Sequence, residues 1–240
     1  MKEKILLIIP AYNEEKNIVS TYKKIVEFNK KNKTNYDVIV INDGSTDNTE
    51  KILSENNIPH IRLVTNLGIG GAVQTGYKYA KENNYDIAIQ FDGDGQHDVN
   101  YISKIIKPLV EQKADMVIGS RFVDKSESEF QSSLLRRIGI KIISVLIKLK
   151  TKQRILDTTS GFRAANKKII KMFSEDYSLE YPEPISNVRV IKKGYKISEV
   201  SVNMIERKEG KSSISAWKSI YYMINVILTI ILMKKGDKNE

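Results

Sequence analysis

The 240-residue sequence contains no cysteine, one tryptophan, two histidines and five prolines. Without cysteine the chain can form neither a disulfide framework nor a thiolate metal site, which agrees with a reducing compartment. The apolar residues 5–9 are too few for the core of a signal peptide, so we expect no secretory leader. We find no internal repeat, no low-complexity linker, and no helix-turn-helix, zinc or RNA-binding signature. A basic nucleic-acid-binding protein is therefore the weakest of the functional classes considered below.

Acidic residues are scarce in the second half of the chain, and the net charge of +10 is accordingly uneven. Residues 1–120 carry 15 Lys and Arg against 16 Asp and Glu, whereas residues 121–240 carry 24 against 13. This asymmetry predicts a polyanionic partner for the second half: a phosphorylated substrate, an anionic membrane or a nucleic acid. A merely solubilising basic surface is the simpler alternative.

Short apolar runs alternate with amphipathic segments over the first 122 residues. We expect strands over residues 4–9, 37–41, 61–65, 85–91 and 115–118, and helices over residues 15–30, up to 55, up to 83 and over 99–112, with Asn13 as the N-cap of the first helix. Short connections between strand and helix favour a mostly parallel sheet with helices on both faces. Ligands bind at the carboxyl ends of the strands in such sheets. Four polar segments should converge there: residues 10–14, 42–47, 92–98 and 119–121.

Two carboxylates, Asp92 and Asp94, follow the fourth apolar run directly. Gly93 and Gly95 allow the backbone to turn sharply and a ligand to approach closely. Carboxylate oxygens suit a hard cation such as Mg²⁺ or Mn²⁺, held together with substrate phosphates. An isolated Asp-Gly-Asp is more often an ordinary turn, and the surrounding motifs decide in favour of a metal site.

After residue 122 the regular alternation of apolar runs and amphipathic segments ends. We expect a polar loop over residues 125–133, a basic amphipathic helix over 134–152, a loop over 157–163 that leads into a helix to about 173, a helix over 183–193 and a strand over 196–205. The 134–152 helix is of a type that lies in a membrane interface, and packing on the sheet is an equal alternative.

Residues 214–233 form a stretch of about 20 mostly apolar residues, near the minimum length for spanning a bilayer. Polar and interface-seeking side chains interrupt it, namely Ser215, Trp217, Lys218, Ser219, Tyr221, Tyr222 and Asn225. We therefore expect a helix lying on the membrane, with packing on the domain or in a dimer as the next alternative and spanning as the last. Lys234, Lys235 and Lys238 would suit anionic headgroups. The predicted organisation is a domain over residues 1–213 and a C-terminal helix with a basic tail over 214–240.

The ordered set of motifs resembles family 2 glycosyltransferases of GT-A fold. The set is Ile9-Pro-Ala-Tyr-Asn-Glu14, Ile41-Asn-Asp-Gly-Ser-Thr-Asp47, Asn66-Leu-Gly-Ile-Gly-Gly71, Asp92-Gly-Asp94-Gly-Gln-His97, Gly119-Ser-Arg121 and Ser160-Gly-Phe-Arg163. The chain is most similar to the branch of dolichyl-phosphate mannose synthases and bacterial polyprenyl-phosphate glycosyltransferases, over residues 4–215. The resemblance implies an α/β GT-A fold, a mostly parallel central sheet flanked by helices, with a C-terminal amphipathic helix.

The resemblance also implies residue roles. Residues implied to bind the nucleotide-sugar are Pro10, Ala11, Tyr12, Glu14, Asp43, Gly71, Asp92, Gly93, Asp94, Gln96 and Arg121; those implied to bind the acceptor phosphate are Arg163, Arg207 and Lys211. Asp92 and Asp94 would hold Mg²⁺ or Mn²⁺, and the catalytic set would be Asp92, Asp94, Glu183 and Arg207. His97 alone is more often a structural hydrogen-bonding group. Two departures stand out: Ile69 where many members have lysine, and Asn42-Asp43 in place of paired aspartates.

The implied activity is inverting transfer of a sugar from a UDP- or GDP-sugar to a polyprenyl phosphate, for a cell-surface polysaccharide or glycoconjugate. The enzyme would be cytoplasmic, peripheral at the inner face of the cell membrane, and a homo-oligomer is conceivable. The closest rival is a transferase that glycosylates a sugar hydroxyl of a lipid-linked oligosaccharide. That acceptor must lose a proton, and Glu183 or, less well placed, Asp98 would be the base. The Tyr181-Pro-Glu-Pro184 sequence keeps this rival open, and a metal-dependent nucleotidyltransferase is a further alternative.

Overall fold

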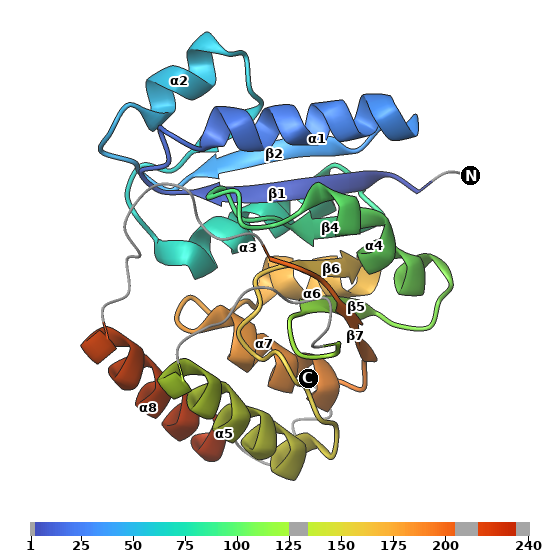
Figure 1. The fold of residues 1–240 in the computed structure, drawn as a ribbon, viewed down its shortest axis with the longest axis vertical. Coiled ribbons are helices and arrows are strands. Elements are labelled where there is room, and N and C mark those ends of the chain that lie inside the picture. The colour runs from blue at the N-terminus through green and yellow to red at the C-terminus, as the bar shows by residue number, and fades with distance from the viewer. Residues whose placement is uncertain (1–2, 125–133, 205–215, 234–240) are drawn as a thin grey trace.

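A seven-stranded sheet forms the centre of the protein, in the order β3-β2-β1-β4-β6-β5-β7 (Figure 1). The structure, a computed structural model, describes residues 3–124, 134–204 and 216–233. The strands are β1 (Ile5–Ala11), β2 (Asp37–Asn42), β3 (His60–Arg62), β4 (Ile87–Gln90), β5 (Met116–Ser120), β6 (Arg163–Asn166) and β7 (Ile197–Ser201). The helices are α1 (Ile18–Asn32), α2 (Thr49–Glu55), α3 (Gly68–Glu82), α4 (Ile102–Val110) after the 3₁₀ turn η1 (Val99–Tyr101), α5 (Leu134–Thr151), α6 (Lys167–Glu175), α7 (Pro182–Lys192) and α8 (Ala216–Leu232).

The sheet is mostly parallel, as predicted. Strand β1 pairs in parallel with β2 and β4, and β5 pairs in parallel with β7. Strand β6 is the exception, since it lies antiparallel between β4 and β5. The prediction of a loop running directly into a helix here was wrong. The four residues of β6 include arginine, two alanines and asparagine, which have little strand propensity, so pairing with its two neighbours, not local preference, makes this strand.

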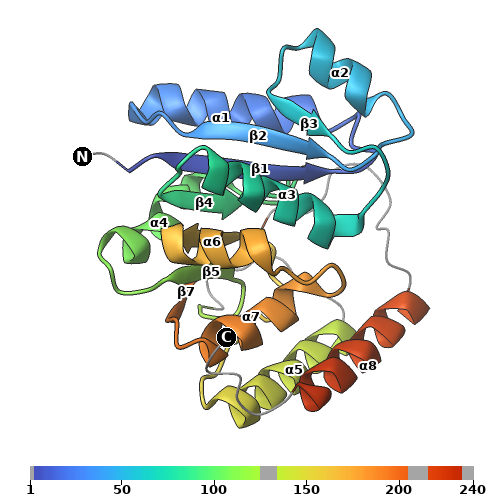
Figure 2. The same ribbon diagram turned by 180° about the vertical axis from the view of Figure 1, so that it is seen from behind.

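Two hydrophobic cores lie on opposite faces of the sheet. In β1, Leu6 and Ile8 face one core, whereas Leu7 and Ile9 face the other, because successive side chains of a strand alternate. Helices α3 and α6 cover the first face side by side (Figure 2), and α1 and α4 cover the second. This layering places the carboxyl ends of β1, β2, β4 and β5 at one edge of the sheet.

The first helix begins at Ile18, three residues later than predicted, and Asn13 does not cap it. Asn13 instead has a positive φ of 56°, and its side-chain oxygen accepts the backbone N–H groups of Thr46 and Asp47 at 2.8 and 3.3 Å. Asparagine tolerates this backbone conformation better than most residues. Asn13 therefore ties the loop after β1 to the loop after β2. Strand β3 is also shorter than predicted, ending at Arg62.

Helices α5 and α8 lie side by side at the end of the molecule farthest from β1 and β2 (Figures 1 and 2). Both contact α7, and Ile143, Ile147, Val226 and Ile230 bury their side chains in the core. The ammonium group of Lys150 donates to the carbonyl oxygen of Ile231 at 2.7 Å, at the end of α8. Both helices thus pack on the domain.

Among the residues that the structure describes, none of the helices has the length and hydropathy needed to cross a bilayer. The predicted loop over residues 125–133 and the lysines at 234, 235 and 238 lie outside the described residues.

Candidate active site

A pocket of about 710 Å³ opens at the carboxyl edge of β1, β2 and β4. Its volume is typical of sites for small-molecule ligands. Twenty residues line it: Pro10, Ala11, Tyr12, Glu14, Asp43, Asn66, Gly68, Ile69, Ala72, Gln90, Asp92, Gly93, Asp94, Thr159, Gly161, Tyr181, Pro182, Glu183, Tyr222 and Met223. Three of the four segments expected to converge, those after β1, β2 and β4, contribute to this wall.

Asp43 joins the β2 edge of the pocket to the start of α3. Its carboxylate accepts the backbone N–H of Leu67 at 2.7 Å, while Asn66 donates to its backbone carbonyl oxygen at 3.2 Å. Burial raises the pKa of Asp43, and the hydrogen bonds from the Leu67 and Gly68 backbone oppose that rise. The preceding Asn42 is fully buried, and its side chain donates to Glu50 at 2.6 Å. Asn42 therefore has a structural partner, which leaves Asp43 as the carboxylate of this pair that reaches the pocket.

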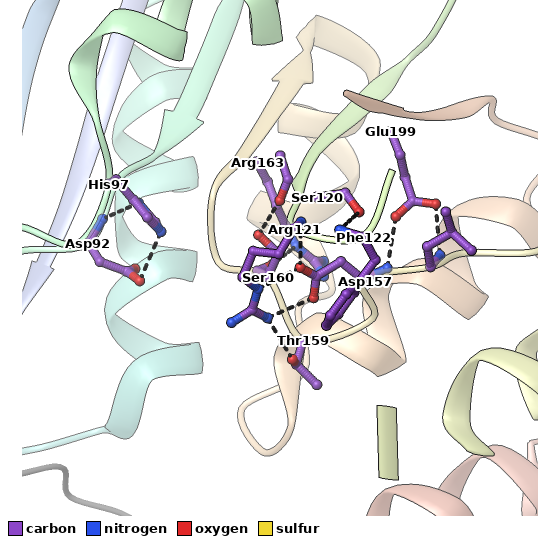
Figure 3. A network of polar contacts seen from close by, with 12 residues as sticks. Asp92, His97, Ser120, Arg121, Phe122, Asp157, Thr159, Ser160, Arg163 and Glu199 are labelled. Atoms are coloured by element: carbon purple, nitrogen blue, oxygen red, sulfur yellow. Dashed lines mark hydrogen bonds and ion pairs between the residues drawn. The ribbon is translucent and has the colours of Figure 1, made fainter. Parts of the chain in front are cut away.

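His97 holds Asp92 through two contacts (Figure 3). The backbone N–H of Asp92 donates to Nδ1 of His97 at 2.9 Å, and Nε2 lies 3.2 Å from the Asp92 carboxylate. Burial lowers the pKa of His97 to about 4, so the ring is neutral at pH 7. Since Nδ1 accepts, the neutral ring carries its proton on Nε2 and donates it to Asp92. The His97 ring stacks on Phe162 with centroids 4.6 Å apart.

Asp92 and Asp94 fit a hard divalent cation. Both line the pocket, and Asp94 accepts the backbone N–H of Gln96 at 3.0 Å, which fixes its side chain. Within residues 3–124, 134–204 and 216–233 there is no group of three or more His, Cys, Asp or Glu that could hold a metal ion by itself. Mg²⁺ is usually bound by one or two carboxylates, and substrate phosphates and water supply its other ligands. Asp92 and Asp94 match this pattern.

Arg121 does not line the pocket. Its guanidinium forms a two-pronged contact with Asp157, Nε to Oδ2 at 2.7 Å and Nη2 to Oδ1 at 2.8 Å (Figure 3). Arg121 is 6% exposed and Asp157 0%, and the backbone N–H of Asp157 donates in turn to the half-buried Glu199 at 2.8 Å. A direct contact of Arg121 with the donor therefore stays a prediction, and in this structure its guanidinium is engaged by Asp157. Its Nη2 also lies 3.3 Å from Thr159 of the pocket wall, so the pair supports the wall from behind.

Arg163 is completely buried in β6 and likewise does not line the pocket. Its Nε donates to the carbonyl oxygen of Ser160, and its Nη1 to Ser186 on α7, both at 2.7 Å. Its positive charge acts on Glu183, which does line the pocket. Burial raises the pKa of Glu183, and Arg163 opposes that rise. The predicted contact of Arg163 with the acceptor phosphate stays a prediction, and in this structure its guanidinium is engaged by Ser160 and Ser186.

The remaining predicted residues divide into two groups. Gly71 and Gln96 lie outside the pocket lining, with Gly71 buried in the first turn of α3. Arg207 and Lys211 lie outside the described residues.

Sequence reasoning predicted Glu183 but missed the rest of the wall formed by α7 and α8. Tyr181, Tyr222 and Met223 approach the pocket only through tertiary packing, and no linear pattern marks them. Gly161 belongs to the Ser160–Arg163 motif, which does not by itself indicate a role for the glycine. A Cβ at this position would lie about 3.1 Å from the Asp92 carboxylate, so glycine lets this loop approach the turn that carries Asp92 and Asp94.

Comparison with known proteins identifies the family. The family model described as "Glycosyl transferase family 2" matches residues 6–173. The chain is 33% identical over 252 residues to the UDP-N-acetylglucosamine–dolichyl-phosphate N-acetylglucosaminyltransferase of Methanococcus voltae, covering 97% of this chain and 96% of that protein. It is 26% identical over 226 residues to the undecaprenyl-phosphate mannosyltransferase of Micrococcus luteus, covering 88% of each.

Among solved structures, the fold matches glucosyl-3-phosphoglycerate synthase from Mycobacterium tuberculosis, crystallised with Mn²⁺, UDP and glucosyl-3-phosphoglycerate. The TM-score is 0.70 at 18% identity, over 98% of this chain and 80% of that chain. The chain thus has the GT-A-type fold predicted from its motifs. It belongs to glycosyl transferase family 2.

Proposed function

We propose that the protein transfers one sugar from a nucleotide-sugar to a polyprenyl phosphate, with inversion at the anomeric carbon. Two relatives that match along most of their length carry names of dolichyl- or undecaprenyl-phosphate glycosyltransferases. The observation that carries the proposal is the composition of the pocket. One group of lining residues is Asp43, Asp92 and Asp94, and a second group is Tyr181 at the start of α7 with Tyr222 and Met223 of α8. An anionic nucleotide diphosphate with a cation suits the first group, and a lipid acceptor suits the second.

The donor would lie along the carboxyl ends of β1, β2 and β4. Both Asp43 and Glu14 line the pocket. Asp43 would accept a hydrogen bond from the base, and Glu14 would accept one from the ribose. Asp92 and Asp94 would hold Mg²⁺ or Mn²⁺, which would stabilise the negative charge of the departing nucleoside diphosphate. His97 keeps the Asp92 carboxylate in place for that role.

A phosphate acceptor is already ionised at pH 7 and needs little help from a base. Arg207 and Lys211 are proposed to bind it, because guanidinium and ammonium groups favour phosphate oxygens. A sugar-hydroxyl acceptor remains the alternative, because Glu183 lies in the pocket wall at the start of α7, where a base could act.

Helices α5 and α8 are proposed to contact the cytoplasmic face of the membrane. They expose eight aliphatic side chains, here called the aliphatic surface: Ile138, Ile142, Val145 and Leu149 of α5, and Ile224, Leu228, Ile231 and Leu232 of α8. Single exposed apolar side chains are ordinary, but a group on two neighbouring helices is typical of an interaction surface. The exposed cations Arg137, Lys141 and Lys148 on α5, and Lys152 directly after it, complement anionic lipid headgroups.

The direct test is an assay with purified protein, Mn²⁺ or Mg²⁺, a panel of UDP- and GDP-sugars, and undecaprenyl phosphate. We expect one donor to yield a labelled lipid and a nucleoside diphosphate. Release of pyrophosphate would instead indicate nucleotidyl transfer. Labelling of a lipid-linked oligosaccharide but not of the lipid phosphate would support the hydroxyl-acceptor alternative.

A further inference from the structure

The wall of the pocket that α7 and α8 build is apolar, in contrast to the acidic ends of the strands. Tyr181 and Pro182 supply it from the start of α7, and Tyr222 and Met223 from α8. The rings of Tyr181 and Tyr222 meet edge to face, with centroids 4.8 Å apart and planes at 84°. We refer to Tyr181, Tyr222 and Met223 as the aromatic wall. The diphosphate of a nucleotide-sugar gains little from such a wall, because its groups are charged, whereas a prenyl chain is apolar along its whole length.

Tyr181 is held in an unusual backbone conformation. Its φ of 52° and ψ of 49° lie in the left-handed region, which side chains with a Cβ rarely adopt, and Pro182 follows directly. Such conformations persist only where the surrounding structure imposes them, and they gather at binding sites. The contact with Tyr222 is one such constraint, and it keeps the Tyr181 ring against α8 and in the pocket lining.

The aromatic wall leads onto the outside of the molecule along α8. Tyr222 and Met223 line the pocket, while Ile224, the next residue, is 52% exposed and belongs to the aliphatic surface. Further along the helix, Val226 and Ile230 turn into the core, and Leu228 and Ile231 face outward. One helix therefore connects the inside of the pocket with an apolar face beside α5.

We propose that the prenyl chain of the acceptor leaves the pocket over the aromatic wall and continues along the aliphatic surface. This inference rests on the proposed function and adds the residues that bind the lipid. The first isoprene units would contact Tyr181, Tyr222 and Met223, which leaves the phosphate facing the donor. Apolar chains gain free energy by leaving water for apolar side chains, so these contacts set the affinity for the acceptor.

The test uses the full chain with geranyl phosphate, a short acceptor that needs no bilayer, and the nucleotide-sugar that proves active. Tyr222→Ala should raise the KM for geranyl phosphate about tenfold, in keeping with the loss of one aromatic contact. The turnover number and the affinity for UDP with Mn²⁺, measured by calorimetry, should stay within about twofold. Tyr222→Phe should restore the KM, because the ring and not the hydroxyl makes the contact.

Tyr221→Ala is the matched control. Tyr221 is the preceding residue of α8, is 67% exposed and does not line the pocket, so its loss should leave the KM unchanged in this soluble assay. Chain length supplies a second readout: the wild type should prefer geranyl over isopentenyl phosphate, and Tyr222→Ala should lose that preference. If Tyr222→Ala lowers the melting temperature, Met223→Ala provides the same comparison.

Three results would overturn the proposal, and they differ in what else they overturn. Equal KM values for Tyr222→Ala and Tyr221→Ala would remove the aromatic wall from acceptor binding while the proposed function stands. Loss of UDP affinity in Tyr222→Ala would assign the wall to the donor. If the wild type bound UDP but glycosylated no prenyl phosphate, both the proposed function and this inference would be wrong.

Discussion

Asp92 and His97 form a closed pair, in which the Asp92 backbone N–H donates to Nδ1 at 2.9 Å and Nε2 lies 3.2 Å from the Asp92 carboxylate. The ring cannot rotate without losing both contacts and its stacking on Phe162. His97 is thus a positioning residue: it fixes the side chain of Asp92 before any ligand binds. It also stays neutral at pH 7, because burial lowers its pKa to about 4.

Loss of His97 should therefore weaken metal binding. Partners that orient a metal-binding group are commonly worth about 10–100-fold in metal affinity or activity. We expect His97→Phe, which keeps an aromatic ring over Phe162 but removes both nitrogen contacts, to raise the half-saturating Mn²⁺ concentration by that factor. His60→Phe is the control, since His60 contacts Glu50 and Ile58 and does not line the pocket. Equal Mn²⁺ dependence in the two variants would contradict this role.

Asp92 and Asp94 should be needed for the metal but not for the fold. We expect Asp92→Asn or Asp94→Asn, or removal of metal with EDTA, to lower transfer about a hundredfold or more, because the cation stabilises the leaving group. Binding also has a thermal signature, since a ligand that binds the native state raises the melting temperature. UDP with Mn²⁺ should raise it in the wild type and not in these variants. Asp98→Asn is the control: Asp98 caps η1 by accepting the N–H of Asn100 at 2.9 Å, and its variant should still respond.

The pair Arg121–Asp157 should contribute to stability more than to catalysis. Removing one partner of a buried ion pair leaves an uncompensated charge and typically costs about 3–5 kcal/mol. We expect Asp157→Asn and Arg121→Met each to lower the free energy of unfolding in urea by an amount of that order, and the double variant to lose less than their sum. Asp176→Asn supplies the comparison, since Asp176 pairs with Arg189 at the surface at 2.6 Å and should cost about 1 kcal/mol or less. If Arg121→Met instead kept its full stability and lost affinity for UDP, that result would support a direct contact of Arg121 with the donor.

The sequence was informative wherever local pattern and motif agreed. The alternation of apolar runs predicted β1, β2, β4 and β5, and the polar segments after β1, β2 and β4 do line one pocket. Motif reasoning assigned Asp43, Asp92 and Asp94 to that pocket because their positions follow directly from strand ends.

Tertiary packing accounts for what the sequence did not predict. Arg121 and Arg163 stand in motifs that suggest phosphate binding. In the structure, however, the guanidinium of Arg121 contacts Asp157, 36 residues further along the chain, and that of Arg163 contacts Ser186, 23 residues further along. A motif gives the residue type but not its partner. Tyr222 reaches the pocket because α8 packs against α7 beside α5, an arrangement that no local pattern encodes.

Glu183 decides between the two acceptor classes. A general base contributes about 10²–10⁴-fold to a rate, so Glu183→Gln should cause a loss of that size if the acceptor is a sugar hydroxyl. With a phosphate acceptor we expect the variant to keep its rate within a few-fold. Burial raises the pKa of Glu183, and a base must be ionised, so the hydroxyl reaction would lose activity as the pH falls through that raised pKa. The phosphate reaction in the variant and the wild type should share one pH profile across this range.

The face formed by α5 and α8 should bind anionic vesicles through both the aliphatic surface and the basic side chains beside it on α5. Basic residues near an anionic surface are worth about 1 kcal/mol each, so Lys141→Gln with Lys148→Gln should weaken sedimentation with phosphatidylglycerol vesicles at least about tenfold. The effect should shrink in high salt, because ions screen exposed charges. Leu228→Glu should also weaken vesicle binding, since Leu228 is 49% exposed on the same surface.

The controls for this surface lie on other helices. Lys30→Gln with Lys31→Gln changes two exposed lysines at the end of α1, and Val110→Glu places a charge at the end of α4, where Val110 is 45% exposed. Both should bind vesicles like the wild type, because neither touches α5 or α8. Light scattering separates a membrane face from a self-association face. If Leu228→Glu turned a dimer into a monomer and left vesicle binding intact, α5 and α8 would join two copies of the chain, and the prenyl chain would need another way out of the pocket.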